Sequence, residues 1–384
     1  MFSRRTEWDL APNRLTLAHQ EFLASGKKII DLTISNPTRA GIAYDESAIL
    51  GALSNPQSLD YDPQPKGLRS AREAVAAYYD LTVDPESLIL TTSTSEGYSF
   101  VFRLLCNPGD EVLVPKPSYP LFDFLAELQD VKLIPYSLLY DHGWQIEFHS
   151  LENAITSKSR AIVLVHPNNP TGSYVSAEER QQLNQLCRQH DLGLIVDEVF
   201  LDYAHGDSQP TFATNRSVLT FTLSGISKIS ALPQMKLAWI AVSGPPAEVE
   251  PAMQRLEVIA DTYLSLNAPV QLAAPVLLDQ RKAVQPQLMN RVCANLAELD
   301  RQLASQKSCS RLEVQGGWYA VLRIPVTRSD EDFAIELLQR SAVLVYPGHF
   351  YDFPGDGYLV LSLIATEAEF HGGVSALLQF ANSL

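Results

Sequence analysis

Seven short apolar runs rich in β-branched residues constrain the fold of this chain more than any other feature of its sequence. They occupy residues 87–92, 111–115, 131–136, 160–166, 192–196, 218–223 and 236–242. Segments with helical spacing separate most of them, at residues 96–105, 121–128 and 176–190. Nearly continuous hydrophobic strands that alternate with helices indicate a mostly parallel sheet covered on both faces. The sequence therefore predicts an α/β fold with a large seven-stranded domain.

The segments on either side of this alternation predict a second, smaller unit. Residues 15–25 read as a helix and 28–34 as a short strand, and residues 247–306 read as helical with interruptions near Pro269 and Pro286. The tail then follows a β-β-α-β-β-α order, with segments 311–314, 318–324, 330–341, 343–346, 358–363 and 367–384. We expect an N-terminal arm (1–50) that contributes to a small domain, a large domain (51–280) and a C-terminal small α+β domain (281–384), which suits a chain of 384 residues.

Composition excludes several classes of function. A formal net charge of −15 argues against a nucleic-acid surface, which needs a basic face. No apolar run is long enough to span a bilayer, and the N-terminus has no apolar core after its basic residues, so we expect neither a membrane partner nor a signal peptide. Cys106, Cys187, Cys293 and Cys309 are scattered without CxxC spacing, which suggests reduced thiols in a cytoplasmic protein and no metal site.

Ligands of open α/β sheets bind at the carboxyl ends of the strands, so the residues that follow each strand are the candidates for chemistry. Ser93, Thr94 and Ser95 follow the first strand and open a helix. Free amides, a partial positive charge and three hydroxyls at one helix start would suit a phosphate. The alternative is an ordinary run of helix-capping residues.

Two further strand ends carry groups that could meet a planar ring. Tyr119 lies between Pro117 and Pro120, which stiffen the chain and could aim the ring to stack on a heterocycle; core filler is the alternative. Asn169 begins the turn Asn-Pro-Thr-Gly at residues 169–172 and could donate a hydrogen bond to a phenolate oxygen. The alternative there is a turn asparagine that satisfies its own backbone.

An acid and an amine complete the set. Asp197 ends an apolar strand, where a carboxylate is costly unless it is paired, and a protonated ring nitrogen would be a natural partner. Lys228 follows the strand at 218–223, with Lys236 eight residues later, so the first could form an imine with a phosphorylated aldehyde and the second could meet its phosphate. A lysine after a strand is by itself more often a solvated charge. Together, however, these groups match the functional groups of pyridoxal 5'-phosphate.

With these residues the chain resembles the fold-type I pyridoxal-phosphate enzymes, and specifically the class I/II aminotransferase family. The resemblance is carried by residues 169–172, Asp197-Glu198, the run Ser-Gly-Ile-Ser-Lys at 224–228, and the stretch 108–120. It implies a homodimer with the cofactor between a large and a small domain near the subunit interface. It makes Tyr61 a phosphate contact given to the neighbouring subunit, and it implies that Ser93, Thr94, Ser95, Ser227 (or Ser224) and Lys236 hold the phosphate.

The implied activity is a ping-pong transfer of an amino group from an amino acid or amine to a 2-oxo acid. In it, Lys228 is the general base and acid, and Asp197 keeps the cofactor ring nitrogen protonated. Two alternatives stay open: a pyridoxal-phosphate lyase or decarboxylase on the same fold, and a non-catalytic module that binds the cofactor for regulation.

Three positions depart from the family pattern. Phe200 replaces the usual tyrosine, so that Asn169 acts alone or Tyr203 reaches in, and Lys236 replaces the usual phosphate-binding arginine. Val360 stands where an arginine normally clamps the substrate α-carboxylate. Arg69, Arg323 and Lys66 are conceivable replacements for that clamp, and Val360→Arg should improve the use of simple α-amino acids.

Overall fold

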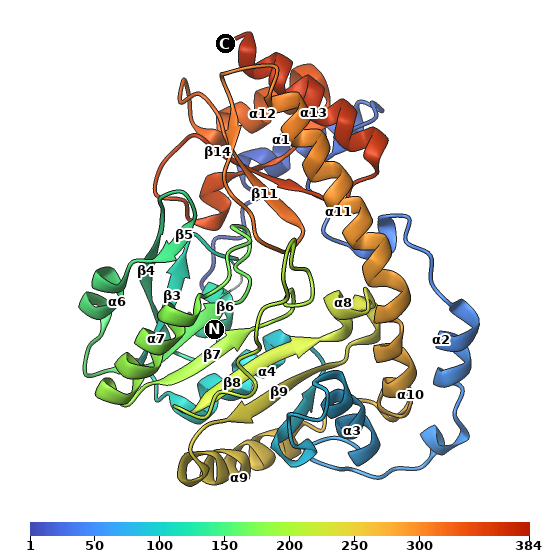
Figure 1. Ribbon diagram of the computed structural model, residues 1–384, viewed down its shortest axis with the longest axis vertical. Helices are drawn as coiled ribbons and strands as arrows, with labels where there is room; N and C mark the ends of the chain where they lie inside the picture. Colours follow the sequence, from blue (N-terminus) through green and yellow to red (C-terminus); the bar gives the residue numbers. More distant parts are fainter. Residues whose placement is uncertain (121) are drawn as a thin grey trace.

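The computed structural model describes residues 1–120 and 122–384 and has a large central sheet with helices on both of its faces (Figure 1). Along the sheet the strands follow the order β2-β9-β8-β7-β6-β3-β4-β5. Their bounds are β2 Leu88–Thr91, β3 Glu111–Lys116, β4 Lys132–Tyr140, β5 Trp144–Ile146, β6 Ser159–Val165, β7 Gly193–Asp197, β8 Thr220–Gly225 and β9 Ala238–Ser243. β4, β3, β6, β7 and β8 pair in parallel, whereas β9 is antiparallel to both of its neighbours. The predicted mostly parallel α/β sheet is thus confirmed.

The seven predicted strands are all present, but the sheet has an eighth. β5 pairs antiparallel with the far end of β4, which runs to Tyr140 and not to residue 136. Exposed and half-buried residues alternate along β4, because β4 and β5 lie at the edge of the sheet. β5, the outer strand of this hairpin, therefore lacks the continuous apolar run by which the seven other strands were predicted.

Helices bury apolar residues against both faces of the large sheet. On one face α4 (Thr94–Leu105) and α9 (Pro246–Tyr263) share a core with Ile240 and Val242. On the other face α3 (Arg69–Tyr78) and α10 (Ala268–Asp279) pack on Trp239 and Ala241. Alternate residues of β9 thus enter opposite cores, as expected of a strand that is buried on both faces. The remaining helices associated with this sheet are α2 (Glu46–Leu53), α5 (Phe122–Glu127), α6 (Phe148–Ala154), α7 (Ala177–His190) and the single turn α8 (Ile226–Ile229).

One long helix, α11 (Arg281–Leu303), leads from the base of the large sheet to the smaller unit (Figure 1). The break between α10 and α11 is at Gln280, so the predicted interruption at Pro286 is wrong. Val284, Leu288 and Val292 of α11 lie on one fully buried face, and this packing carries the helix through the proline. Pro269 lies in the first turn of α10, where a missing N–H costs nothing.

The smaller unit is a four-stranded sheet in the order β10-β11-β14-β13, with α12 (Asp330–Ser341) and α13 (Glu367–Asn382) sharing its core. Its strands are β10 Ser310–Arg311, β11 Tyr319–Arg323, β13 Tyr346–Pro347 and β14 Tyr358–Ser362. The strand predicted at 343–346 is split in two: β12 (Val343–Leu344) pairs with β1 (Ile30–Asp31) of the N-terminal arm, and β13 pairs with β14. The predicted domain bounds themselves stay a proposal.

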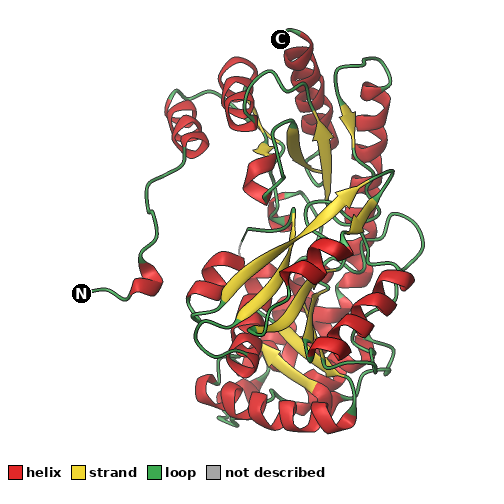
Figure 2. Ribbon diagram, turned by 90° about the vertical axis from the view of Figure 1, so that its left-hand side faces the viewer, coloured by secondary structure: helices red, strands yellow, loops and turns green. Residues whose placement is uncertain are grey.

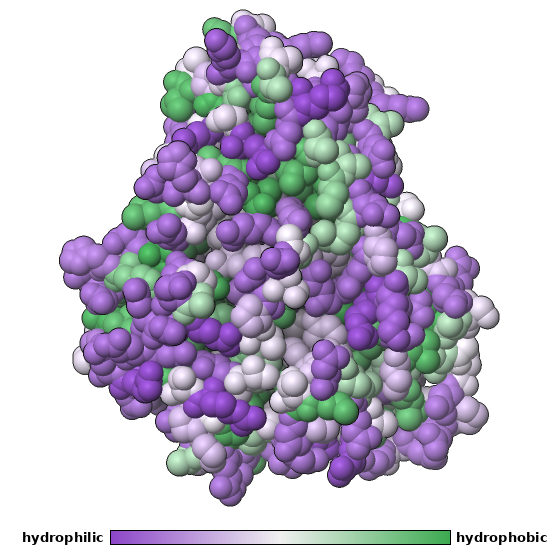
Figure 3. All heavy atoms as spheres, in the orientation of Figure 1, coloured by the Kyte–Doolittle hydropathy of each residue, from purple (hydrophilic) through white to green (hydrophobic). Residues whose placement is uncertain are grey.

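The N-terminal arm packs on the smaller unit through more than this strand pair. Its helix α1 (Arg14–Ala24) shares the core of α12 and α13, with Leu15, Ala18 and Phe22 buried there. The residues before α1 run along the outside of the molecule (Figure 2), and Arg5 forms an ion pair with Asp130. Apolar surface gathers over β11 and α11 on the face drawn in Figure 3. That surface lies where the smaller unit meets the large one.

Candidate functional site

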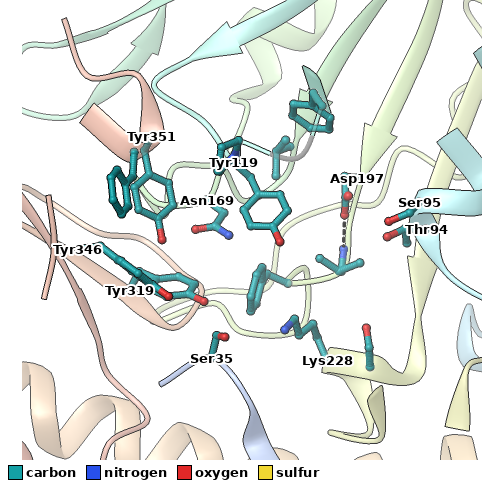
Figure 4. Close-up of a pocket in the computed structure, with 17 residues that line it drawn as sticks. Ser35, Thr94, Ser95, Tyr119, Asn169, Asp197, Lys228, Tyr319, Tyr346 and Tyr351 are labelled. Atoms are coloured by element: carbon teal, nitrogen blue, oxygen red, sulfur yellow. Dashed lines mark hydrogen bonds between the residues drawn. The ribbon is translucent and has the colours of Figure 1, made fainter. Parts of the chain in front are cut away.

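A cavity of about 430 Å³ lies between the carboxyl ends of the central strands and the smaller sheet (Figure 4). The large sheet and its loops contribute most of the predicted site residues, and the smaller unit and the arm contribute the opposite side. Its lining consists of Ser35, Thr94, Ser95, Tyr119, Pro120, Phe122, Val165, Asn169, Asp197, Val199, Phe200, Ser227, Lys228, Tyr319, Tyr346, Phe350 and Tyr351. The cavity therefore lies at the edge of the sheet where the strand-end rule predicts a ligand.

Two hydroxyls and a helix start form one end of the cavity. Thr94 and Ser95 are the first two residues of α4 and line the cavity. Ser93 is the N-cap of that helix, where its hydroxyl accepts a hydrogen bond from the Glu96 amide at 3.2 Å, and it does not line the cavity. Ser227, in the single turn after β8, also lines the cavity, whereas the Ser224 hydroxyl donates to the Glu198 carbonyl oxygen at 3.3 Å. Free amides and three hydroxyls thus face one region that suits an anion.

Asp197 is the last residue of β7 and opens onto the cavity. Its carboxylate accepts hydrogen bonds from the Val199 amide at 3.1 Å and from the Tyr98 hydroxyl at 3.3 Å. Burial raises the pKa of Asp197 to about 6, against the opposing effect of these two donors and of Lys228. A carboxylate in this surrounding gains most from a cationic partner supplied by a ligand.

Lys228 presents its amine to the same cavity from α8. Burial lowers the pKa of Lys228 to about 8, and the charge of Asp197 opposes this shift only in part. The amine lies 5.2 Å from the ring centroid of Trp318 and 5.6 Å from that of Phe200. About a tenth of this amine is consequently deprotonated at pH 7, far more than for an exposed lysine, and the deprotonated form is the one that attacks a carbonyl.

Tyr119 and Asn169 line the same cavity, and in Figure 4 they lie between Asp197 and Tyr351. In the part of the chain that the structure describes, the buried Oδ1 atom of Asn169 has no hydrogen-bond partner. Its turn depends on Gly172, which has a positive φ of 69° and whose added Cβ would come within 2.5 Å of the Gly316 carbonyl oxygen. The turn is therefore fixed against the smaller unit and holds an amide that a ligand can satisfy.

Three predicted contacts are not brought into the cavity. The Tyr203 hydroxyl donates to the Lys228 carbonyl oxygen at 2.7 Å, so Tyr203 supports the lysine backbone and does not replace the hydroxyl missing at Phe200. Lys236 is exposed and lies outside the lining, just after the short helix η5 (Pro233–Met235). Tyr61 is 84% exposed and belongs to another hollow with residues 264–268.

The proposed substitutes for the missing clamp also lie elsewhere. Val360 is fully buried in β14, paired with Val321 and Tyr346, and does not line the cavity. Arg69 pairs with Glu73 and Lys66 with Glu86, while Arg323 lies over the rings of Tyr140 and Tyr358. Among the lining residues that the structure describes, Lys228 is the only cation.

Sequence reasoning missed the side of the cavity built by the smaller unit. Ser35, Tyr319, Tyr346, Phe350 and Tyr351 come from the arm, β11, β13 and the short helix η6 (Gly348–Tyr351). No motif joins these residues, because they meet only when the smaller sheet is assembled over the large one. Tyr319 and Tyr346 are brought together by the pairing of β11 and β13 with β14, for which the sequence carries no separate signal.

The residues present fit pyridoxal phosphate. A helix start with hydroxyls suits its phosphate, Asp197 suits a protonated ring nitrogen, and the NH2 group of the Asn169 side chain can donate to a phenolate oxygen. The lowered pKa of Lys228 suits covalent attachment to an aldehyde. We find no cluster of metal-ligating side chains in the described ranges 1–120 and 122–384.

Comparison with known proteins gives consistent results. A family model described as aminotransferase class I and II matches residues 27–369. The chain is 27% identical over 350 residues to glutamate-pyruvate aminotransferase AlaA of Haemophilus influenzae, covering 87% of each protein. It is 26% identical over 373 residues to the alanine aminotransferase of Mycobacterium tuberculosis, covering 93% of this chain and 86% of that protein.

Solved structures show the same fold. An alanine aminotransferase from Pyrococcus furiosus superposes with a TM-score of 0.90 at 22% identity and covers 100% of both chains. An aminotransferase from Escherichia coli superposes with a TM-score of 0.86 at 23% identity and covers 100% of this chain and 98% of that chain.

Proposed function

Because the chain belongs to the class I and II aminotransferase family and is an aminotransferase, we propose that it uses pyridoxal 5'-phosphate to move an amino group from an amino acid or amine to a 2-oxo acid. The observation that carries the proposal is the meeting of Lys228, Asp197 and the start of α4 at one cavity. An amine, an acid and an anion site at one place are what this cofactor requires.

Each group has a distinct task. Thr94, Ser95 and Ser227 would hold the phosphate, Tyr119 would lie against the ring, and Asn169 would donate to the phenolate oxygen. Asp197 would hold a proton on the ring nitrogen, because an ionised carboxylate raises the pKa of a cation beside it. When bound, the cofactor supplies an electron-poor ring that takes up the negative charge left on the substrate carbon.

Lys228 would move the proton between the substrate Cα and the cofactor carbon C4'. Its pKa of about 8 places it close to the operating pH, where a single amine can serve first as a base and then as an acid. The rings of Phe200 and Trp318 surround the amine and limit its solvation. In this surrounding the amine loses its proton more readily than the amine of an exposed lysine.

The names of the relatives suggest the first substrates to test. Proteins that are 26–27% identical are named alanine and glutamate-pyruvate aminotransferases, so we propose alanine or glutamate as donor and pyruvate or another 2-oxo acid as acceptor. The absence of an arginine from the described lining residues is a reason to include amines without a carboxylate in the panel.

We further propose a cytoplasmic homodimer in which Tyr61 reaches the neighbouring active site. Tyr61 lies on an exposed loop outside its own cavity, and all four cysteines are unpaired. Over the described residues, the helices are too short or too polar to cross a membrane.

Single-turnover spectroscopy tests the function. The purified protein loaded with pyridoxal phosphate is mixed with alanine, glutamate and a panel of amines, and an aminotransferase converts its absorption band to that of pyridoxamine phosphate. Lys228→Ala should not make this conversion, and borohydride should label wild-type protein at Lys228 only. Release of ammonia or CO2 without the pyridoxamine band would indicate a lyase or decarboxylase, and no spectral change with any amine would indicate a non-catalytic module.

A further inference from the structure

Three tyrosines of the smaller unit converge on the cavity opposite the cofactor-binding groups. Tyr319, Tyr346 and Tyr351, here called the tyrosine cluster, face the side of the cavity away from Asp197, Thr94 and Ser95, and Ser35 lies below them (Figure 4). The ring centroids of Tyr346 and Tyr351 are 6.2 Å apart, and Tyr319 lies near enough to contribute to the raised pKa of Tyr351. The cluster therefore faces the part of a substrate that lies beyond the reacting carbon.

Apart from a contact between Tyr319 and Ser35, which lines the same cavity, the hydroxyls of the cluster are not bonded to the protein. Buried tyrosines elsewhere, such as Tyr98, Tyr136 and Tyr203, donate to protein oxygens. Within residues 1–120 and 122–384, Ser35, beside Tyr319, is the only hydrogen-bond partner found for a cluster hydroxyl, although Tyr319 and Tyr351 are only 7% and 5% exposed. Buried hydroxyls normally have a partner, so these are available for a ligand.

The donors are also neutral. Burial raises the pKa of Tyr319 and of Tyr351 far above the ordinary value, so both hydroxyls keep their protons at any working pH. Lys228 is the sole cation of the described lining, and its amine is committed to the cofactor. Val360, the position at which the family resemblance predicts an arginine, is an apolar residue that pairs with Tyr346 across the strands.

We propose that the tyrosine cluster, with Ser35, binds the non-reacting end of the substrate through neutral hydroxyl donors, and that it accepts a carboxylate, carboxamide or ester there with similar efficiency. This rests on the proposed aminotransferase function. The substrate class is then an amine that carries an oxygen acceptor on its reacting carbon.

The physical basis is the difference between a charged clamp and a neutral one. An arginine fork gains from the full charge of a carboxylate and therefore rejects an uncharged analogue strongly. Hydroxyl donors bond to a carboxylate more strongly than to an amide, but a carboxylate also loses more hydration on entering a cavity without a cation. Because these effects oppose each other, the cluster should have little net preference for a carboxylate over a carboxamide.

Kinetics with three matched donors test the charge selectivity. For the wild-type holoenzyme we expect kcat/KM for alaninamide to lie within about tenfold of that for alanine, and kcat/KM for ethylamine, which lacks the acceptor, to be at least about a hundredfold lower. Rejection of alaninamide by more than about a hundredfold would overturn the proposal, because that degree of discrimination requires a cation such as one supplied by a partner subunit.

Variants then assign the effect to the cluster. Tyr319→Phe and Tyr351→Phe should each raise KM about tenfold for alanine and alaninamide, with kcat and the use of ethylamine little changed. The matched control is Tyr358→Phe in β14, whose ring stacks on Phe353 outside the cavity and whose kinetics should be those of wild type. Unchanged KM values in both cluster variants would overturn the proposal.

A binding measurement separates failure of this proposal from failure of the proposed function. Calorimetry of propionate and propionamide with the holoenzyme needs no turnover, and both probes should bind with similar Kd and lose about tenfold in the two cluster variants. If no amine converts the cofactor band, the proposed function fails while this comparison still decides whether the cluster binds ligands. If propionate binds selectively, and neither Tyr319→Phe nor Tyr351→Phe weakens its binding, the tyrosine cluster is not the binding site.

Discussion

At the scale of single residues, the pKa values of Lys228 and Asp197 are shifted toward each other. Burial lowers the pKa of the lysine to about 8 and raises that of the aspartate to about 6, so each is easier to neutralise than an exposed counterpart. A ligand that bonds covalently to the amine and brings a cation to the carboxylate relieves both costs.

The pH dependence of cofactor capture reports the lysine. Only the deprotonated amine attacks an aldehyde, and the protonated form predominates below the pKa of about 8. We expect the rate at which the cofactor-free protein captures pyridoxal phosphate, followed by stopped-flow absorbance, to rise with pH and level off just above pH 8. An ordinary lysine has a pKa of 10.5, so a rate that still climbs tenfold per pH unit between 8 and 10 would contradict the shift.

Asp197→Asn removes the charge that holds a proton on the cofactor ring. We expect transamination to fall by about 10² to 10⁴, because the ring then takes up carbanion charge poorly. The same change removes the influence that raises the pKa of Lys228, so the capture profile should move to lower pH. Tyr98→Phe, which removes only one 3.3 Å hydrogen bond to Asp197, is the control and should cost less than about tenfold. Equal losses in both variants would deny Asp197 its proposed role.

The residues found from sequence share one property, which is that each directly follows a strand. Thr94, Ser95, Asn169, Asp197 and Lys228 all line the cavity, because parallel strands end at one edge. Ser93 and Lys236 lie equally near a strand end, but the first caps its helix and the second is turned to solvent. Local sequence does not distinguish these outcomes, since they depend on the direction of one side chain.

At the scale of elements, β14 determines what lies behind the tyrosine cluster. Cross-strand partners share a face, so Val360 lies on the same side as Tyr346 and Val321, and Tyr319 is two residues from Val321. The position is therefore directed toward the cavity but is covered by tyrosines. The sequence identified position 360 as unusual. It could not show that tyrosines of β11 and β13 lie beside it, because those strands are brought together only in the folded sheet.

Val360→Arg tests that arrangement. A guanidinium at this position can reach the cavity only past the cluster, so we expect kcat/KM for alanine to rise, that for alaninamide to fall, and the free energy of unfolding to drop by about 3 kcal/mol through partial burial of the charge. Denaturant unfolding and kinetics with both donors give the measurement. Val360→Leu should leave the ratio of the two substrates unchanged, and an unchanged ratio in the arginine variant would place residue 360 outside substrate recognition.

Elements with weak local patterns were the ones that sequence could not predict. β5 is an edge strand of three residues without a continuous apolar run, and the junction at Gln280 has no proline or glycine to mark it. The proline-marked break at 285–286 was predicted instead, although packing of the buried face of α11 overrides it. Strong periodicity, as in α4, α7 and the central strands, gave elements within a few residues of their observed bounds.

At the scale of the whole molecule, the cavity exists because two units meet. The Ser118 amide donates to the Tyr351 carbonyl oxygen at 2.9 Å, and Lys116 pairs with Asp352 at 2.9 Å, so the end of β3 is fastened to the short helix that carries part of the tyrosine cluster. The groups that we propose to bind the cofactor thus come from the large unit, and those that we propose to bind the substrate come from the smaller unit and the arm. A second chain is the further contributor that we propose, through Tyr61.

Mixed dimers test that contribution. Lys228→Ala lacks the reacting amine, and Tyr61→Ala lacks the proposed phosphate contact; each homodimer should be nearly inactive at limiting cofactor concentration. If Tyr61 serves the neighbouring site, one site of the mixed dimer combines an intact Lys228 with an intact Tyr61. Unfolding and refolding an equal mixture should then recover roughly a quarter of wild-type activity, since half the dimers are mixed and each has one whole site.

The control replaces Tyr61→Ala by Asp197→Asn, a residue of the same cavity as Lys228. When both substitutions affect residues of the same chain's cavity, one site of the mixed dimer carries Lys228→Ala and the other carries Asp197→Asn. No site is intact, so activity cannot be recovered. Recovery with Tyr61→Ala but not with Asp197→Asn would show that the two residues act from different chains. No recovery in either mixture, or a protein that sediments as a monomer while fully active, would mean that Tyr61 acts in its own chain or not at all.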